Sequence, residues 1–231
     1  SATELIKKTK NNELSATEVI SAYLEHIKKV NPELNAIVDD MSDEATKRAE
    51  ILDQATIAGE PKGRLFGVPV TIKINVDQKG YATSNGVTAL KNLIADSNAP
   101  IVDHLMKAGA IFVGRTNTPE FSFRADTENP LYGRTNNPWG KHLSPGGSSG
   151  GASSAVMAGM CALAHGNDIG GSLRFPSVAT GAVTLKPGLG RVPAWNSSQT
   201  SERGILAQSM SVQGLITRSA SDLQLAMPEI I

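Results

Sequence analysis

The 231-residue sequence predicts an α/β layer fold built as one domain. Segments with helical apolar periodicity recur along the chain, and short apolar runs typical of buried strands alternate with them. Hydrophobic residues make up 40% of the chain, which is ample for one core, and the length fits one domain or at most two. We assign residues 1–231 to a single domain, because no internal repeat or low-complexity linker divides them.

Charge and composition narrow the range of partners. The 22 acidic and 22 basic residues give a net charge of zero, which does not favour nucleic acid or an anionic membrane as a partner. No apolar run approaches the roughly 18 residues of a membrane-spanning helix, and residues 1–12 lack the apolar core of a secretory signal. Cys161 is the only cysteine, so we expect no disulfide framework and no cysteine metal site, and a reducing cytoplasm is the expected location. We expect no metal ion and no cofactor.

The first two helices are marked by their starts. Ser1-x-x-Glu4 and Ser15-x-x-Glu18 are both capping boxes ahead of apolar runs. The helix that follows the second box is expected to stop at Pro32, because proline lacks the N–H group that a helix interior needs. Its apolar face is formed by Val19, Ile20, Tyr23, Leu24 and Ile27.

The clearest strand pattern lies in residues 68–77. A strand candidate at residues 36–38 and a charged helix at residues 43–58 precede it. Apolar and polar side chains then alternate, so that one face of the strand carries Val68, Val70, Ile72, Ile74 and Val76. The opposite face carries Lys73, which is therefore held in a fixed direction on an otherwise apolar strand.

The middle of the chain continues the alternation of helix and strand. Residues 99–108 predict a helix with Pro100 at its start, and residues 111–114 predict the strand that follows it. Residues 121–141 are rich in Asn, Pro, Gly and Thr, and they are expected to form a long ordered loop.

Two glycine-rich loops that carry serines lie within residues 142–187. They bracket a small-residue helix at residues 150–161 and a buried strand at residues 162–166. A helix of about 12 residues advances about 18 Å, and a strand of about five residues runs back about 16 Å. Ser172 can therefore return to the neighbourhood of Ser148. The second loop could also gather N–H groups into a nest for a developing negative charge, those of Ile169, Gly170, Gly171 and Ser172.

Three separated motifs resemble the amidase signature family. They are Gly67-Val-Pro-Val-Thr-Ile-Lys73, Gly146-Gly-Ser-Ser-Gly-Gly151 and Asp168-Ile-Gly-Gly-Ser-Leu-Arg-Phe-Pro-Ser177, in the order that the family has. Members of this family hydrolyse amides with a Ser–cis-Ser–Lys triad. Matching the motifs residue by residue places the nucleophile at Ser172, the bridging serine at Ser148 and the lysine at Lys73.

The resemblance implies a fold and a reaction. The fold is a mixed β-sheet covered by α-helices on both faces, and the reaction is hydrolysis of a small-molecule amide through an acyl-enzyme. The nest described above would be the oxyanion hole, and the peptide bond before Ser148 would be cis. Lys73 acts as a base only when neutral, so burial must lower its pKa from about 10.4 towards about 7–8. Ser149, Asp168 and Arg174 are expected to support the site, the last two as a pair that braces the loop.

The chain also departs from the family pattern. Asn167 stands where the family commonly has Thr. Family domains are much longer than this chain, so the fold is expected to be incomplete at its C-terminus. A terminal helix capped by Ser221 is cut by Pro228, and the apolar pair 230–231 is expected to leave apolar surface uncovered. We therefore expect a second polypeptide segment or a homo-oligomer to complete the fold.

Two other functions stay open beside the serine amidohydrolase. A glutaminase (A) subunit of a glutamyl-tRNA amidotransferase would use the same triad to release ammonia, but the neutral charge gives it no support. A non-catalytic, anion-binding fragment explains the glycines but not the joint presence of Lys73, Ser148 and Ser172. His142 and His165 lie near the motifs, yet the family chemistry needs no histidine.

Overall fold

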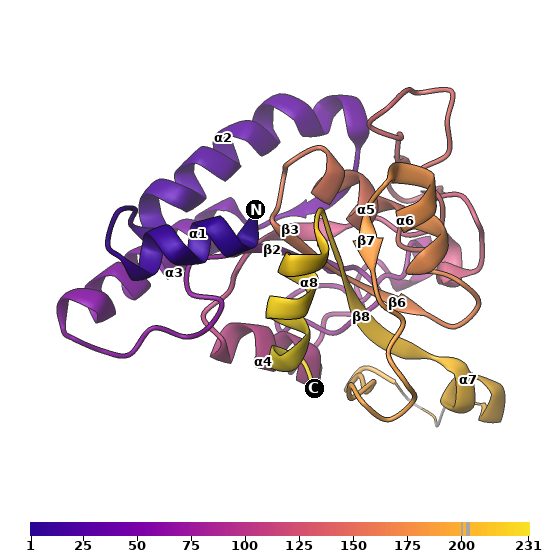
Figure 1. Cartoon of the computed structure of the whole chain (residues 1–231). Helices are drawn as coiled ribbons and strands as arrows, with labels where there is room; N and C mark the ends of the chain where they lie inside the picture. The colour runs from indigo at the N-terminus through magenta and orange to yellow at the C-terminus, as the bar shows by residue number, and fades with distance from the viewer. Residues whose placement is uncertain (200, 202–203) are drawn as a thin grey trace.

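A six-stranded mixed β-sheet organises the computed structural model, which describes residues 1–199, 201 and 204–231 (Figure 1). The strand order is β1-β3-β2-β6-β8-β7. β2 runs parallel to both of its neighbours, whereas β1, β8 and β7 run antiparallel to theirs. The strands are β1 (Ile37–Asp40), β2 (Pro69–Lys73), β3 (Ile111–Thr116), β6 (Leu163–Asp168), β7 (Val183–Thr184) and β8 (Val212–Thr217). The mixed sheet that the resemblance implies is therefore confirmed.

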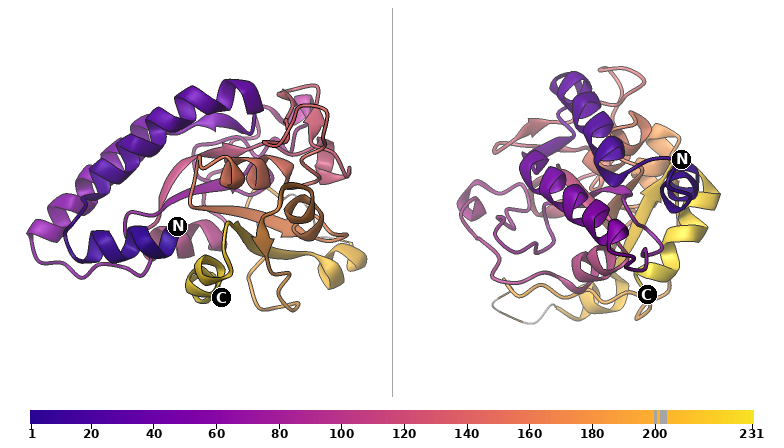
Figure 2. Two further views of the ribbon diagram at one scale, coloured as in Figure 1. Left: turned by 45° about the horizontal axis from the view of Figure 1, so that its top comes forward. Right: turned by 90° about the vertical axis from the view of Figure 1, so that its left-hand side faces the viewer.

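Helices cover both faces of this sheet, as the two views of Figure 2 show. One buried apolar cluster packs α1, α4 and α8 against one face, and a second cluster packs α2, α3 and α5 against the other. The helices are α1 (Ala2–Lys10), α2 (Ala16–Leu34), α3 (Ser42–Ile57), α4 (Pro100–Lys107), α5 (Gly150–Met157), α6 (Arg174–Thr180), α7 (Ile205–Met210) and α8 (Ala220–Ala226). The predicted α/β class with helices on both faces is confirmed.

Shorter elements fill the connections. Single 3-10 turns occur at Thr88–Leu90, Glu120–Ser122 and Met227–Glu229. The predicted long loop at residues 121–141 contains a small hairpin of β4 (Glu128–Asn129) and β5 (Gly133–Arg134). Short paired strands of this kind add backbone hydrogen bonds to a loop that carries little apolar surface of its own.

β2 is shorter than the alternating pattern predicts and ends at Lys73. The chain turns there, and Val76 N–H donates to the Lys73 carbonyl oxygen at 3.2 Å. Both faces of the strand are buried: Val70 and Ile72 join the cluster beneath α4 and α8, while Lys73 points to the opposite face. The predicted direction of Lys73 is confirmed, but the lysine lies at the carboxyl end of a central strand rather than in its middle.

α2 begins at its predicted capping box, but the prediction that Pro32 stops it is wrong. The helix continues to Leu34 with Pro32 inside its last turn. The Asn31 side chain ties down the chain beyond the helix end, because its Oδ1 accepts from the N–H groups of Ala36 and Ile37, each at 3.0 Å. The capping box at Ser1 is also confirmed, and it opens α1.

The C-terminal segment differs from its prediction in two respects. Ser219, not Ser221, caps α8, because the Ser219 hydroxyl accepts from Asp222 N–H. Ile230 is fully buried in the cluster on the α8 face, and only Ile231 is exposed, to 56%. The expected uncovered pair is therefore reduced to one residue. Asp222 also binds the N–H and hydroxyl groups of Thr3, at 2.8 and 2.7 Å, which ties α8 to α1.

α5 and β6 form the predicted out-and-back path with shifted boundaries. The helix ends at Met157 instead of continuing to 161, and Gly159 turns the chain with a left-handed φ of 77°. β6 then extends to Asp168, two residues beyond the predicted strand, and pairs in parallel with β2. The carboxyl ends of β2 and β6 therefore meet at one edge of the sheet, where Lys73 and Asp168 lie.

Candidate active site

The side chain of Lys73 is fully buried among oxygen atoms. Its Nζ atom lies 2.7 Å from Ser148 Oγ, 2.9 Å from Asn167 Oδ1 and 3.2 Å from Ser149 Oγ. A neutral amine has two N–H groups and one lone pair. Asn167 and Ser149 can accept the two protons, which leaves the lone pair for the Ser148 hydroxyl. With the two protons placed so, the lone pair of a neutral Lys73 would face Ser148 Oγ.

Electrostatics favour the neutral form of Lys73. Burial lowers the pKa of Lys73 well below its ordinary value, and attraction to the Asp168 carboxylate offsets only part of that effect. The direction agrees with the requirement stated from the sequence. A lysine amine of this kind can accept a proton at a pH where an exposed lysine cannot.

An asparagine pair holds one of the oxygen atoms that contact Lys73. Asn167 Nδ2 donates to Asn75 Oδ1 at 2.9 Å, and Asn75 Nδ2 donates to Asn167 Oδ1 at 3.2 Å. Asn75 Nδ2 also donates to Ser122 Oγ at 2.9 Å. The sequence marks Asn167 only as a departure from the family pattern, so sequence reasoning missed this contact. One feature of the sequence could have indicated the contact: the side-chain oxygen of Asn167 is a hydrogen-bond acceptor, and the buried amine of Lys73 requires acceptors.

The backbone around Ser148 is enclosed on both sides. The Gly147–Ser148 peptide bond is cis, as the resemblance implies. A Cβ atom at Gly147 would lie 2.3 Å from the Arg124 carbonyl oxygen, so only glycine fits there. Ser148 is 1% exposed, and its carbonyl oxygen accepts from Thr118 Oγ1 at 2.9 Å. Ser149 is the N-cap of α5 but makes no side-chain capping bond, which leaves its hydroxyl for the lysine.

Asp168 and Arg174 form the predicted brace across the second glycine loop. The Arg174 guanidinium donates from Nε to Asp168 Oδ2 and from Nη2 to Asp168 Oδ1, each at 3.0 Å. The same carboxylate accepts from the N–H groups of Gly171 at 2.9 Å and Leu173 at 3.1 Å. Burial alone would raise the pKa of Asp168, but these hydrogen bonds outweigh it and lower the pKa. Asp168 is therefore an ionised structural anchor for the loop.

Ser172 lies in this braced loop, between β6 and α6, and is half-buried. The residue after Ser172 lies close to the start of α5, since Leu173 and Ser149 both pack against Gly166. A Cβ atom added at Gly166 would lie 2.8 Å from Leu173 Cδ2 and 2.8 Å from Ser149 Oγ. Within the part of the chain that the structure describes, the Ser172 hydroxyl forms no hydrogen bond with Ser148 or Lys73. The structure thus joins two of the three predicted triad residues by a contact and brings the third into the same region.

The predicted oxyanion nest needs one correction. The Gly171 N–H group is already used, because it donates to the Asp168 carboxylate at 2.9 Å. The N–H groups of Ile169, Gly170 and Ser172 donate to no acceptor among the residues that the structure describes. These three groups, without Gly171, are the donors in this loop that a developing oxyanion could use.

His165 lies beside the site but is held in a structural role. Its Nε2 atom lies 2.8 Å from Gln213 Oε1, and its Nδ1 accepts from Lys73 N–H at 3.4 Å. Burial is the main cause that lowers the pKa of His165 to about 4, and the neighbouring basic groups of Lys73 and Arg115 act in the same direction. His165 is therefore neutral at physiological pH and positions the backbone of β2.

Folding stability should consequently fall when the medium is acidified below pH 6.5. The unfolded chain binds a proton at His165 near pH 6.5, whereas the folded chain resists it until about pH 4. This difference should cost about 3 kcal/mol of unfolding free energy by pH 4. Urea titrations from pH 7 to pH 4 measure it, with His165→Gln as the comparison because glutamine does not titrate. If the unfolding free energies of the wild-type protein and His165→Gln fell equally between pH 7 and pH 4, the expectation would be contradicted.

Comparison with known proteins places this site in a family. A family model described as Amidase matches residues 18–231. The chain belongs to the amidase family. An indoleacetamide hydrolase from Bradyrhizobium diazoefficiens is 52% identical over 227 residues, which are 98% of this chain and 43% of that protein. The A subunit of a glutamyl-tRNA(Gln) amidotransferase from a Synechococcus strain is 41% identical over 186 residues, which are 80% of this chain and 38% of that protein.

A solved structure agrees with this membership of the amidase family. A bacterial aryl acylamidase of the amidase signature family matches with a TM-score of 0.92 and 33% sequence identity. The match covers 100% of this chain and 47% of the acylamidase. This amidase-family chain therefore spans less than half the length of the indoleacetamide hydrolase and of the acylamidase.

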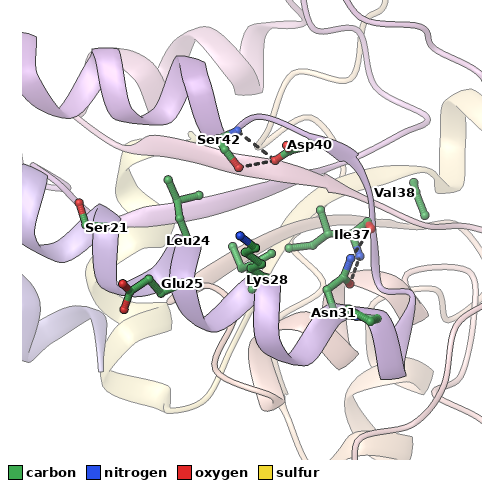
Figure 3. A pocket seen from close by; sticks show the side chains of 11 residues that line it. Ser21, Leu24, Glu25, Lys28, Asn31, Ile37, Val38, Asp40 and Ser42 are labelled. Atoms are coloured by element: carbon green, nitrogen blue, oxygen red, sulfur yellow. Dashed lines mark hydrogen bonds between the residues drawn. The ribbon is translucent and has the colours of Figure 1, made fainter.

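A large pocket elsewhere in the molecule does not belong to the site. It has a volume of about 720 Å³ and lies between α2 and β1, where Lys28 and Glu25 line one wall and Asp40 the other (Figure 3). Lys73, Ser148 and Ser172 do not line it. Among the described residues, no helix is long and apolar enough to cross a membrane, and no three His, Cys, Asp or Glu side chains gather as metal ligands.

Proposed function

We propose that this chain carries the catalytic centre of an amide hydrolase, with Ser172 as nucleophile, Ser148 as proton bridge and Lys73 as base. One observation carries the proposal: a fully buried lysine amine lies 2.7 Å from the hydroxyl of Ser148, with its pKa lowered. Lys73 forms no ion pair with a carboxylate of the described residues, and a structural role explains such a buried lysine poorly. A base for proton transfer explains it.

The proposed reaction begins with two proton transfers. Ser148 passes its hydroxyl proton to the lone pair of Lys73 and takes the proton of Ser172, whose oxygen attacks the amide carbonyl. The free N–H groups of Ile169, Gly170 and Ser172 would hold the resulting oxyanion. The proton then returns through Ser148 to the leaving nitrogen, the C–N bond breaks and an acyl-enzyme remains. Water, deprotonated along the same path, releases the acid.

The proposed substrate class is a primary amide with an aromatic acyl group, of small or medium size. Support comes from the name of a similar protein, an indoleacetamide hydrolase that is 52% identical to this chain. The bracing of the loop that carries Ser172 is consistent with a rigid site for such an acyl group.

A second candidate is release of ammonia from glutamine for a tRNA-linked amidotransferase. The 41% identity to the A subunit of such an enzyme favours it, because the alignment covers most of this chain. The net charge of zero does not help in binding tRNA, so another polypeptide would have to supply that contact. We rank this function below hydrolysis of a primary amide with an aromatic acyl group.

A substrate panel tests the proposal and separates the two candidates. The purified chain would be assayed for ammonia release from indole-3-acetamide, phenylacetamide and glutamine, with Ser172→Ala as the blank. We expect release from the aryl amides at a rate at least about tenfold above that from glutamine. Preferential hydrolysis of glutamine would favour the second candidate, and no release from any of the amides would contradict the hydrolase.

We also infer that a further polypeptide segment, or a second copy of this chain, covers the exposed apolar side chains of α6 and of α7. Large apolar side chains are exposed there, namely Phe175, Val178, Ile205, Leu206 and Met210. The short edge strand β7 lies next to α6 and is paired on one side only. Similar proteins are about twice as long as this chain, which supports a longer polypeptide as the occupant.

Light scattering tests that inference directly. The purified 231-residue chain is expected to self-associate at micromolar concentration, because its apolar side has no cover. Replacing Ile205 and Leu206 by Ser should reduce the association, whereas replacing Ile57, which is exposed on α3, should not. A monodisperse wild-type monomer that turns over amides at about 1 per second or faster would contradict the inference.

A further inference from the structure

A second cavity, separate from the triad, lies between α3, α4 and the start of β3. Its volume is about 300 Å³, at the lower end of the range for small-molecule sites. Its apolar lining includes Met41, Ala45, Met106, Ile111 and Phe112. Methionine side chains adapt their shape to flat apolar ligands, so this lining suits an aromatic ring.

Two buried polar atoms of this cavity have no partner. Gln78 is 5% exposed, and its Nε2 donates to Met41 Sδ at 3.5 Å, but its Oε1 accepts no hydrogen bond from the described residues. Arg48 Nε is likewise buried and without a partner in the described part of the chain. Both residues line the cavity. Buried polar groups in native proteins are almost always paired, so these two atoms indicate a missing acceptor at Arg48 and a missing donor at Gln78.

The charges around the cavity favour an anion. Arg48 and Lys79 both line it, and neither forms an ion pair with a described residue. The Glu44 carboxylate lies at the same rim, but it accepts a hydrogen bond from the Tyr81 hydroxyl at 2.8 Å. Two cations therefore face one carboxylate that already has a partner. A guanidinium without a partner is suited to bind a carboxylate through two parallel hydrogen bonds.

We propose that this cavity binds a small aromatic carboxylic acid that carries one N–H or O–H donor. The carboxylate pairs with Arg48, the donor binds Gln78 Oε1, and the ring packs on Met41 and Met106. Lys73, Ser148 and Ser172 do not line this cavity, and the proposed binding does not require the proposed hydrolysis. Because indole-3-acetate is also the product of the proposed hydrolysis, the variants of Arg48 and Gln78 described below assign its binding to this cavity.

Isothermal titration calorimetry with three related probes tests this site. Indole-3-acetate has the ring, the carboxylate and one N–H group. 1-Methylindole-3-acetate lacks the N–H group, and 3-methylindole lacks the carboxylate; none of the three is an amide. We expect saturable binding of indole-3-acetate and at least about tenfold weaker binding of each analogue. Equal affinity for all three probes, or no binding of indole-3-acetate at millimolar concentration, would overturn the proposal.

Variants then locate the bound probe. Arg48→Met should weaken indole-3-acetate binding by about tenfold or more, and Arg48→Lys should weaken it less, because lysine keeps the charge without the planar fork. Lys47→Met is the matched control, since Lys47 is exposed on the same helix and does not line the cavity. In Gln78→Leu, methylation of the indole nitrogen should no longer change the affinity. Unchanged binding in Arg48→Met, with a wild-type circular dichroism spectrum, would place the probe elsewhere and overturn the proposal.

Discussion

Replacement of Ser172 by alanine is expected to abolish amide hydrolysis and to leave the fold intact. The loss should be about 10⁴-fold or more in kcat, because no other group can form the proposed acyl-enzyme. Ser172 is half-buried, and its hydroxyl forms no hydrogen bond with Ser148 or Lys73. Removal of the hydroxyl therefore costs neither of these buried residues a hydrogen-bond partner. The measurement is steady-state hydrolysis of indole-3-acetamide, together with the thermal midpoint of each protein.

Ser221→Ala is the matched control for this experiment. Ser221 is exposed on α8 and lies away from the loop of Ser172, so its replacement should change neither rate nor stability. Ser172→Ala should have the same thermal midpoint as Ser221→Ala, but Ser172→Ala alone should lose activity. If Ser172→Ala kept more than a few per cent of the wild-type rate, Ser172 would not be the nucleophile.

Loss of Lys73 should have the second large effect. Lys73→Met preserves most of the buried volume but removes the base, and we expect kcat to fall by at least about 10³-fold. For the wild-type protein the rate should rise with pH and then level off, because the lysine works only after it loses its proton. Burial lowers the pKa of Lys73, so the levelling should occur well below pH 10.5.

The pH profile of single-turnover hydrolysis from pH 5 to pH 10 measures this expectation. Lys73→Arg is a useful second variant, because arginine retains a positive charge but cannot lose its proton in this range. Both variants should lack the rising limb as well as most of the rate. A wild-type rate that keeps rising up to pH 10, as for an exposed lysine, would argue against a buried neutral base.

Much of this site could be predicted from local pattern. The period-two alternation before Lys73 predicts the face on which its side chain lies. The order of a helix followed by a returning strand predicts that Ser172 comes back towards Ser148, although α5 is shorter and β6 longer than predicted. The capping boxes at Ser1 and Ser15 were also sufficient to find the starts of α1 and α2. Such features depend on near neighbours in the chain, which is why sequence alone reveals them.

Other features depend on partners that are distant in sequence. Asn167 contacts Lys73 from a neighbouring strand, 94 positions away. The use of Gly171 N–H by Asp168 could not be read from a glycine pattern, because the pattern shows only where a nest can form. The sequence likewise does not show that the chain beyond α2 is held by Asn31 Oδ1, which accepts from the N–H groups of Ala36 and Ile37. Sequence order does not disclose which acceptors a fold has already used.

The central claim is that Ser172 is an activated nucleophile, and active-site labelling tests it most directly. The folded chain would be treated with a fluorophosphonate, digested, and analysed by mass spectrometry to find the modified residue. The predicted result is a single adduct on Ser172, formed by the wild-type protein and strongly reduced in Lys73→Met and in heat-denatured chain. An adduct on Ser148 or another serine, or no adduct on protein that circular dichroism shows to be folded, would contradict it.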